Sequence, residues 1–384
     1  MSKPKVLLTN FHPCGVGGHT TYFQRLLAGG LDEQFDVAVA APETSLIFRL
    51  VKSSGRRAFA CDFPGNIKEI PGVIRSVQRL GEIWREFPFQ ILHCNGSRDH
   101  SIAVWWKVWM RTQARIVRTH HAIRQVHDDA YHRWIHIRQT ELHIYVSHAQ
   151  ANINEAGRAL RFPASAVIVH GVDLNHFTPT PKCDAVLREL NLHADQFIFG
   201  SVAGTSTYKR PDLMLKAVAR LPEKLRERAV VVVLGGESGG RQLGKLAQDL
   251  GIAGQFRFVS HQEDVRPFVT VFDVAFLLSD VVESASFAAR EMMAMGSPMI
   301  CSGYSGLLEV VDEGVTGFIT RVGDVSAVAF AAESFLNMQP ERLQQFRRAA
   351  REKAVRCFSQ ELLTQKTCAA YQRVLSAPLA SAIE

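Results

Sequence analysis

Residues 273–296 read DVAFLLSDVVESASFAAREMMAMG, and this stretch decides the fold. It begins with an apolar run of the length of a buried strand, and from Ser286 it continues as good helix formers that end at Gly296. Glu283 is therefore expected in the strand-to-helix turn, and Glu291 inside the helix. A helix N-terminus suits phosphate, and carboxylates on either side of it can accept hydrogen bonds from sugar hydroxyls.

The composition is that of a globular protein. The chain has 384 residues, enough for two ordinary α/β domains, and 47% of them are hydrophobic. No apolar run reaches the roughly 18 residues that span a bilayer, and residues 1–5 lead into a strand without a signal-peptide core. The seven cysteines are scattered without a C-x-x-C pair, which argues against a disulfide framework and a zinc ribbon. The sequence therefore predicts a cytoplasmic protein.

The charge is uneven along the chain. Residues 1–170 carry 21 Lys and Arg against 13 Asp and Glu, or +8, and the remainder carries 23 against 24, or −1. Such a basic half suits an anionic acceptor or an anionic lipid surface, although ordinary surface charge explains it equally well. Nucleic acid is not expected as a partner, because none of the motifs that bind it is present.

Strand-like runs alternate with helical patterns on both sides of one break. The strand-like runs are 5–10, 36–40, 90–93, 115–119, 197–202, 229–234, 255–259, 274–279 and 298–301. This alternation predicts parallel sheets covered by helices on both faces. The break is the stretch 172–181, which is rich in proline and turn residues and is typical of a linker between domains.

The glutamate pair resembles the E-x7-E signature of the retaining glycosyltransferases of family 4, which have the GT-B fold. Further pieces match that family in the same order along nearly the whole chain. They are Gly15-Val-Gly-Gly18, Ile91-Leu-His93, Val117-Arg-Thr-His-His121, Val146-Ser147, His170-Gly-Val-Asp173 with Phe177 and Pro179, Lys209-Arg-Pro-Asp212, Leu234-Gly-Gly236, Phe258 with Asp264, and Ser305-Gly306 with Glu309, Gly314 and Gly317. One glycine-rich loop would be a weak signal, whereas this ordered set is a strong one.

The resemblance implies an α/β protein of the GT-B type, with two Rossmann-like, doubly wound parallel-sheet domains facing each other across a cleft. Residues 1–172 would bind the acceptor, and a C-terminal helix at about 362–384 would pack back on them. Residues 173–361 would bind the nucleotide sugar.

The resemblance also implies roles for individual residues. Lys209 would act as a mobile point charge on the leaving diphosphate, and Glu283 would contact the transferred sugar. His121, with His120 as the alternative, would meet the donor sugar, and a neutral imidazole there can donate to a hydroxyl. These three, His121, Lys209 and Glu283, are the predicted catalytic residues. The predicted substrate-binding residues are Gly17, Gly18, Arg210, Ala285, Ser286, Phe287 and Glu291, the last of which would hold the ribose.

Two positions depart from the family pattern. The arginine that usually stands five residues before the lysine is Gly204 here, so Arg210 or the hydroxyls of residues 205–207 are candidates to replace it. In the family, a Phe-Gly pair usually stands two and three residues after the first glutamate of the motif, and here that pair is Ala285-Ser286. Backbone N–H groups can still approach a phosphate there.

Several other site types are disfavoured. The loop at Gly15–Gly18 half-matches a dinucleotide fingerprint, but Thr20 occupies the third glycine position, and a Walker loop is absent. His132 and His136 are four residues apart, but no third metal ligand stands at a recognisable spacing, and an Asp-x-Asp dyad is missing. No metal and no cofactor are therefore expected. The tryptophan-rich run 105–111 could lie at a membrane interface, and packing of one helix face on a sheet is the simpler interpretation.

The resemblance implies a retaining, metal-independent glycosyltransferase with a UDP-sugar as the first choice of donor. The acceptor would be an anionic saccharide or a lipid-linked one, in the synthesis of bacterial lipopolysaccharide, capsule or other envelope polysaccharide. The enzyme would be cytoplasmic, either free or peripheral on the inner face of the membrane. The alternatives are a sugar-nucleotide epimerase of the same fold and a nucleotide-sugar-binding protein without turnover.

Overall fold

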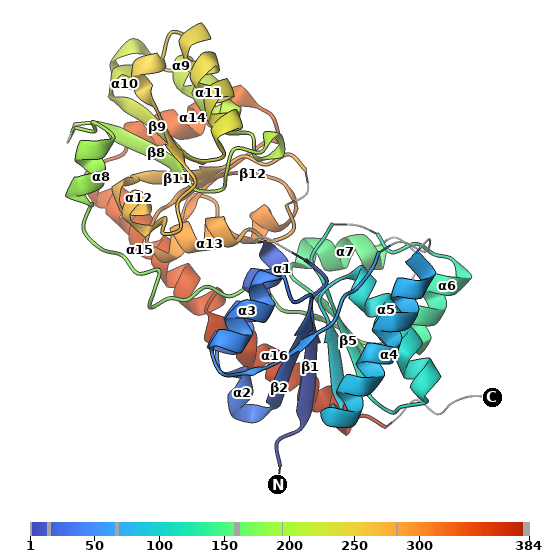
Figure 1. The fold of residues 1–384 in the computed structure, drawn as a ribbon. Helices are drawn as coiled ribbons and strands as arrows, with labels where there is room; N and C mark the ends of the chain where they lie inside the picture. The colour runs from blue at the N-terminus through green and yellow to red at the C-terminus, as the bar shows by residue number, and fades with distance from the viewer. Residues whose placement is uncertain are drawn as a thin grey trace. The chain divides into compact units, whose positions relative to one another are not determined.

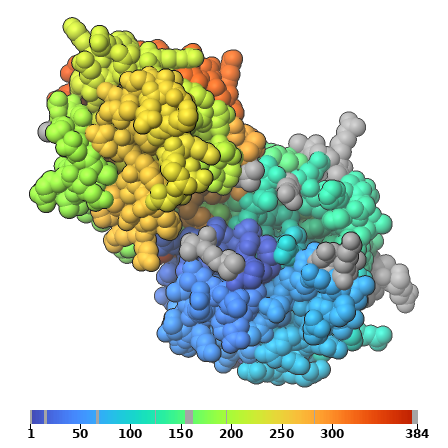
Figure 2. Space-filling view, turned by 45° about the horizontal axis from the view of Figure 1, so that its top comes forward, coloured from blue at the N-terminus to red at the C-terminus, as the bar shows by residue number. Residues whose placement is uncertain are grey.

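A computed structural model describes residues 2–13, 17–65, 69–123, 125–156, 162–193, 195–281 and 283–378. The chain forms two compact units, one made of residues 1–171 and 360–384 and the other of residues 172–359. The sequence analysis places the division after residue 172 and the return of the chain at about 362. In the space-filling view the first unit carries the blue-to-teal part of the chain, and the second carries the green-to-orange part (Figure 2).

The first unit is built on a seven-stranded parallel sheet with the order β3-β2-β1-β4-β5-β6-β7 (Figure 1). The strands are β1 (Lys5–Thr9), β2 (Asp36–Ala41), β3 (Arg57–Ala60), β4 (Ile91–Cys94), β5 (Arg115–His120), β6 (Leu142–Tyr145) and β7 (Ser165–Val167). The helices are α1 (Gly18–Ala28), α2 (Leu31–Gln34), α3 (Leu46–Ser53), α4 (Ile70–Glu86), α5 (Ser97–Met110), α6 (Ala130–Arg133), the π-helix η2 (Trp134–Arg138), α7 (His148–Ala156) and the returning α16 (Gln360–Ser376).

The second unit is built on a six-stranded parallel sheet with the order β10-β9-β8-β11-β12-β13. The strands are β8 (Phe197–Ser201), β9 (Ala229–Gly235), β10 (Phe256–Ser260), β11 (Val274–Leu277), β12 (Met299–Ser302) and β13 (Gly317–Thr320). The helices are α8 (Asp184–Glu189), α9 (Pro211–Ala219), α10 (Glu223–Arg228), α11 (Glu237–Asp249), α12 (Arg266–Val271), α13 (Phe287–Ala294), α14 (Val325–Leu336) and α15 (Pro340–Cys357), with 3-10 turns η3 (Thr207–Lys209), η4 (Ala253–Gln255) and η5 (Ser305–Glu309). The prediction of two Rossmann-like parallel-sheet domains is confirmed.

Each sheet reverses its strand order at one place. In the first unit the reversal lies between β1 and β4, and in the second it lies between β8 and β11. Open parallel sheets bind ligands beyond the carboxyl ends of the strands at such a reversal. The loops after these strands carry most of the predicted site residues, so the topology brings those residues to one edge of each sheet.

The central strands are buried along their whole length, as expected for sheets covered on both faces. All seven residues of β9, AVVVVLG, are buried, and α9 and α14 pack side by side on this sheet. Among the described helices, none combines the length and the apolar character that crossing a bilayer requires.

Helix α16 returns to the first unit and packs against α1. The approach is close, because a Cβ atom on Gly29 would come within 2.3 Å of the Thr364 hydroxyl oxygen. The buried His93 at the end of β4 ties this helix to the sheet: its Nδ1 is hydrogen-bonded to the Tyr371 hydroxyl and its Nε2 to Thr119 Oγ1. His93 therefore has a structural role.

Candidate active site

In the second unit, Lys209 and Glu283 form an ion pair. Lys209 ends the turn η3 after β8, and Glu283 lies in the turn between β11 and α13. The Lys209 Nζ atom is 2.5 Å from Glu283 Oε2, and Ser279 Oγ donates to the same oxygen at 3.1 Å. Both charged side chains are largely buried, with 15% and 7% exposed. The structure thus brings two predicted catalytic residues together, with the Lys209 ammonium paired to the Glu283 carboxylate.

Arg210 is engaged by two carboxylates. Its guanidinium donates to Asp212 at 2.9 and 3.2 Å and to Asp280 at 2.7 Å. Asp212 and Asp280 raise the pKa of this guanidinium above its usual value. Arg210 would have to leave these partners to replace the missing family arginine on a phosphate.

The loop after β8 explains why glycine stands at position 204. Gly204 has a φ of +90°, which side-chain-bearing residues rarely adopt. The next residue, Thr205, packs so closely on the end of β9 that a Cβ atom on Gly235 would lie 2.7 Å from its side chain. Its hydroxyl donates to the Gly236 carbonyl at 3.1 Å. An arginine at position 204 would be strained in this loop.

The E-x7-E motif lies on a turn and a short helix, as predicted. Ser286 is the N-cap of α13, and its Oγ accepts from the Ala289 N–H at 3.2 Å, so its side chain serves the helix. Ala285 is buried, Phe287 opens the helix, and Glu291 lies one turn into it. The turn is also packed from behind, because a Cβ atom on Gly306 would lie 1.8 Å from the Ser284 carbonyl oxygen.

Arg290 is a charged residue at this motif that the sequence analysis missed. It is fully buried on α13, and its Nε and Nη2 atoms have no hydrogen-bond partner among the described residues. Burial lowers the pKa of Arg290 to about 10, while the charges of Glu309 and Glu283 oppose that shift. The side chain adds a positive charge behind the turn that carries Glu283.

In the first unit, Gly17 and Gly18 lie at the start of α1. Gly17 is the N-cap and Gly18 is the first helical residue, so the predicted loop-to-helix junction is present. A Cβ atom on Gly17 would meet nothing within 4 Å, so packing alone does not require glycine there. Residues 14–16, which include Gly15, lie outside the described residues.

The two adjacent histidines after β5 have different surroundings. The His121 Nε2 atom lies 2.6 Å from Asn95 Oδ1, and its Nδ1 lies 3.3 Å from His170 Nε2. Burial, followed by the charges of His19 and His170, lowers the pKa of His121 well below its usual value. His120 instead lies in a buried cluster, and its ring stacks on Tyr145. Of the two candidates, His121 contacts Asn95, which follows β4, and His19, on α1.

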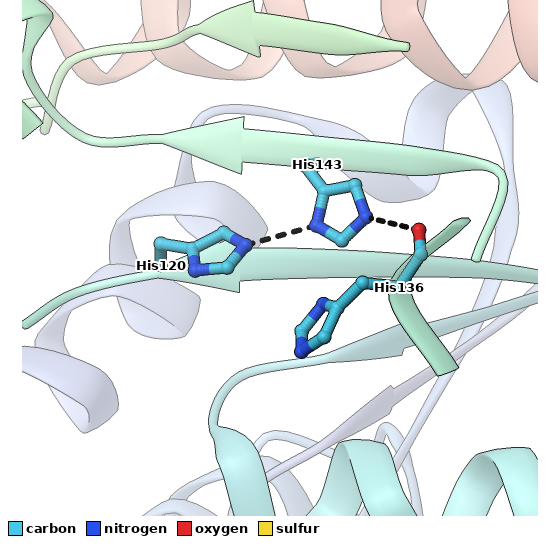
Figure 3. A group of neighbouring side chains, drawn as sticks. All are labelled: His120, His136 and His143. Carbon is cyan, nitrogen blue, oxygen red and sulfur yellow. Dashed lines mark hydrogen bonds between the residues drawn. The ribbon is translucent and has the colours of Figure 1, made fainter. Parts of the chain in front are cut away.

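His120 belongs to a cluster with His136 and His143, whose candidate ligand atoms all lie within 4.8 Å of one another (Figure 3). The His120 Nε2 atom is 2.9 Å from His143 Nδ1, and His143 Nε2 donates to the His136 carbonyl at 3.0 Å. The sequence alone could not reveal this cluster, because its three histidines come from different elements, β5, η2 and β6.

The surroundings of this cluster keep its imidazoles neutral, the form in which histidine also binds metals. Burial and the nearby charge of Arg118 lower the pKa of all three histidines, to about 2 for His136 and about 3 for His143. Arg118 is partly buried, and its Nη1 lies 2.9 Å from His100 Nδ1. A divalent cation would face the repulsion of this guanidinium and would have to break the hydrogen bond between His120 and His143.

Two family models match this chain. Residues 184–353 match the family described as Glycosyl transferases group 1, and residues 16–176 match Glycosyltransferase Family 4. A D-inositol 3-phosphate glycosyltransferase of Mycobacterium sp. (strain KMS) is 34% identical over 224 residues, which are 56% of this chain and 48% of that protein. The corresponding protein of Geodermatophilus obscurus is 35% identical over 180 residues, 44% of this chain and 40% of that one. The chain spans about half the length of the curated relatives it matches.

Solved structures share the fold. A glycosyltransferase from Rickettsia africae ESF-5 has a TM-score of 0.84 at 15% identity, covering 98% of this chain and 100% of that one. Anabaena Alr3699/HepE in complex with UDP has a TM-score of 0.80 at 17% identity, covering 97% and 100%. The two parallel-sheet units thus define a protein of the GT-B class. The chain belongs to the group 1 glycosyltransferases of family 4.

Proposed function

We propose that the protein is a retaining, metal-independent glycosyltransferase that takes its sugar from a nucleotide-diphosphate donor. The observation that carries this proposal is the pair of Lys209 and Glu283 beside the N-terminus of α13. Breaking the bond between sugar and diphosphate leaves negative charge on the phosphate and positive character on the sugar. The Lys209 ammonium group can stabilise the negative charge on the phosphate, and the Glu283 carboxylate can stabilise the positive character of the sugar.

The proposed sequence of events begins with exchange of the lysine's partner. When the diphosphate enters, its oxygens compete with Glu283 for the Lys209 ammonium, and the N-terminus of α13 adds its positive end. Glu283 keeps the Ser279 hydroxyl as a donor and can accept a hydrogen bond from a sugar hydroxyl. Lys209 then stabilises the leaving group most strongly as the bond breaks. None of these steps requires a metal.

UDP-glucose is our first choice of donor. The Anabaena protein was solved with UDP, with UDP and glucose, and with UDP-glucose. For the acceptor we propose an anionic saccharide or a lipid-linked one in envelope polysaccharide synthesis. The net charge of +8 on residues 1–170 supports an anionic acceptor. The relatives are named for inositol 3-phosphate, and one structure of the same fold is a lipopolysaccharide outer core galactosyltransferase.

We also propose that the protein works on the cytoplasmic face of a membrane. On α5 the side chains of Trp105, Val108 and Trp109 are exposed, whereas Trp106 is buried. One face of this helix therefore packs in the core, and the other face is exposed. Tyr131 is exposed as well, and the Trp134 ring contacts both it and Trp105. Indole and phenol rings beside cations suit the headgroup region of an anionic bilayer.

The test of the function is a donor panel followed by product analysis. Nucleotide diphosphates and their sugars that bind the native protein should raise its apparent melting temperature. Incubation with the stabilising donor, without added Mg²⁺ or Mn²⁺, should release the nucleotide diphosphate and yield a new glycoside. An epimerised nucleotide sugar would indicate the epimerase alternative, and stabilisation without either product would indicate binding alone. A strict requirement for Mg²⁺ or Mn²⁺ would contradict metal independence.

A further inference from the structure

The ring of His121 is held by groups from three other segments of the first unit. Asn95 follows β4 and faces the Nε2 atom at 2.6 Å, and His170 faces the Nδ1 atom at 3.3 Å. The ring of His19, on α1, packs on the His121 ring with 4.3 Å between their centroids. The ring therefore cannot rotate without breaking several contacts.

The amide of Asn95 determines which nitrogen of His121 carries the proton. Its Nδ2 group donates to the His19 carbonyl at 2.9 Å. The Oδ1 atom is therefore the end of the amide that meets His121, and an oxygen can only accept. The proton of the neutral imidazole accordingly lies on Nε2, and Nδ1 is left as an acceptor.

Asn95 is itself held in place by a buried carboxylate. Asp99, in the first turn of α5, accepts the Asn95 backbone N–H at 2.7 Å and the Thr9 hydroxyl at 2.8 Å on the same oxygen, Oδ2. Gly96 lets the neighbouring loop approach, because a Cβ atom there would lie 2.1 Å from the Phe11 ring. The carboxyl ends of β1, β4 and β5 are thus linked through Asp99, Asn95 and His121.

We propose that Asn95, anchored by Asp99, is a positioning residue that fixes the Nε2–H tautomer of His121 and so presents Nδ1 as a hydrogen-bond acceptor. The inference rests on the proposed role of His121 at the donor sugar. It changes that role in one respect: His121 accepts a hydrogen bond from a sugar hydroxyl at Nδ1, where the resting structure has His170. The sequence analysis expected a donating imidazole.

The same contacts exclude Asp99 as a group that meets an acceptor sugar. Its side chain is fully buried, and its Oδ2 atom is occupied by Thr9 and Asn95. Asp99 therefore acts through Asn95 and not on substrate.

The direct test is the tautomer of His121 in the wild-type protein without substrate. Long-range ¹H–¹⁵N correlation spectra distinguish a protonated ring nitrogen from an unprotonated one, and the spectrum of His121→Gln assigns the signals. We expect the proton on Nε2 at neutral pH. A proton on Nδ1 would overturn the inference, and this measurement needs no variant at position 95 that might fail to fold.

The second test is kinetic. Asn95→Ala should reduce the excess of the Nε2–H form and lower kcat about tenfold, the equivalent of one hydrogen bond, with the KM for the donor within about twofold. Thr140→Val is the matched control, because it removes the 2.7 Å partner of another buried histidine, His100, and should change neither kcat nor the His121 signals. An Asn95→Ala enzyme with unchanged kcat would contradict the positioning role.

Failure of this inference can be distinguished from failure of the proposed function. The tautomer of His121 is measured without donor, so it is informative even if the chain transfers no sugar. Turnover is proposed to depend on Lys209, which belongs to the other unit. If no donor supports sugar transfer but His121 has the expected tautomer, the proposed function is rejected and the positioning of His121 stands.

Discussion

Lys209 is the residue on which the proposed chemistry depends most, because its charge is needed chiefly when the leaving diphosphate forms. Lys209→Ala should therefore lower kcat by roughly 100-fold, comparable to the loss of one preorganised donor at a developing anion. Donor affinity should change much less, since in the resting protein the lysine is already occupied by Glu283. Steady-state kinetics with a nucleotide-sugar donor provide the measurement.

Lys216 offers a matched control for this substitution. It is also in the second unit and also paired, with Asp212 at 2.8 Å, but it lies on the exterior of α9. Lys216→Ala should leave kcat unchanged. If the folded Lys209→Ala enzyme kept turnover within about threefold of wild type, Lys209 would have no role in catalysis.

Glu291 should behave differently, because it is assigned to the ribose, which is held equally in the ground and transition states. Glu291→Ala is expected to raise the KM for the donor with little change in kcat. Isothermal titration with the nucleotide diphosphate is the second measurement, and an unchanged affinity would remove Glu291 from the site.

The sequence could predict the site residues that belong to local motifs, but not the contacts between them. Glu283, Ser286 and Glu291 lie where the strand-to-helix pattern placed them. The contact between Lys209 and Glu283 spans 74 residues of sequence, and no local pattern encodes it. Asn95 and Arg290 were missed for the same reason, since their importance comes from partners on other elements.

At the scale of elements, α5 combines a buried and an exposed aromatic face. Arg98 on this helix and its C-cap, Arg111, are exposed, whereas the helix's only acidic residue, Asp99, is buried. We expect the protein to sediment with vesicles that contain anionic lipid and not with neutral vesicles, and high salt should weaken the binding. Replacing both Trp105 and Trp109 by alanine should reduce the bound fraction several-fold.

Phe330 provides the control for this surface, because it is 74% exposed on α14 of the second unit. Phe330→Ala should bind vesicles like the wild type. All five tryptophans lie in residues 84–134, so a blue shift of the emission on anionic vesicles would report this region alone. Equal binding of the double variant and the wild type would show that another surface contacts lipid.

The strands that the sequence missed lie at or next to a sheet edge, whereas most of those it predicted lie further inside the sheets. The missed strands β3, β6, β7 and β13 have four, four, three and four residues. The equally short β4, β11 and β12 are buried throughout, whereas β3 and β7 carry exposed positions and give no clear apolar run. The seven-residue β9 is buried throughout, and its apolar run identifies it.

At the scale of the whole molecule, buried histidines make the first unit sensitive to acid. Burial lowers the pKa of His19, His93 and His143 to about 3, from an ordinary value of 6.5. Below pH 6.5 the unfolded chain binds protons that the folded unit cannot bind. The free energy of unfolding therefore falls as the pH drops from 6.5 towards 3.

One group opposes this trend. Burial raises the pKa of Asp99 to about 6 from 3.8, so protonation of Asp99 favours the folded state as the pH falls from about 6 towards 3.8. The histidines outnumber it, and the net effect of acid is destabilising.

The measurement compares two probes of thermal unfolding at pH 7.5 and pH 5.5. Tryptophan fluorescence reports the first unit, because residues 172–359 contain no tryptophan. Circular dichroism reports both units. The fluorescence midpoint should fall more than the circular-dichroism midpoint on acidification. Equal shifts of both would mean that the buried histidines do not control the stability of the first unit.

The central claim is retention, and the stereochemistry of the product tests it most directly. Glu283 is engaged by Lys209 and Ser279, Asp99 is buried, and the acceptor nitrogen of His121, Nδ1, faces His170 and is assigned to a hydroxyl of the donor sugar. None of these groups is placed as a base that would activate an acceptor from the opposite face of the sugar. Proton NMR of freshly formed product from an α-linked donor such as UDP-glucose reports the new linkage through its anomeric coupling. The account predicts an α-linked product, and a β-linked product would contradict it.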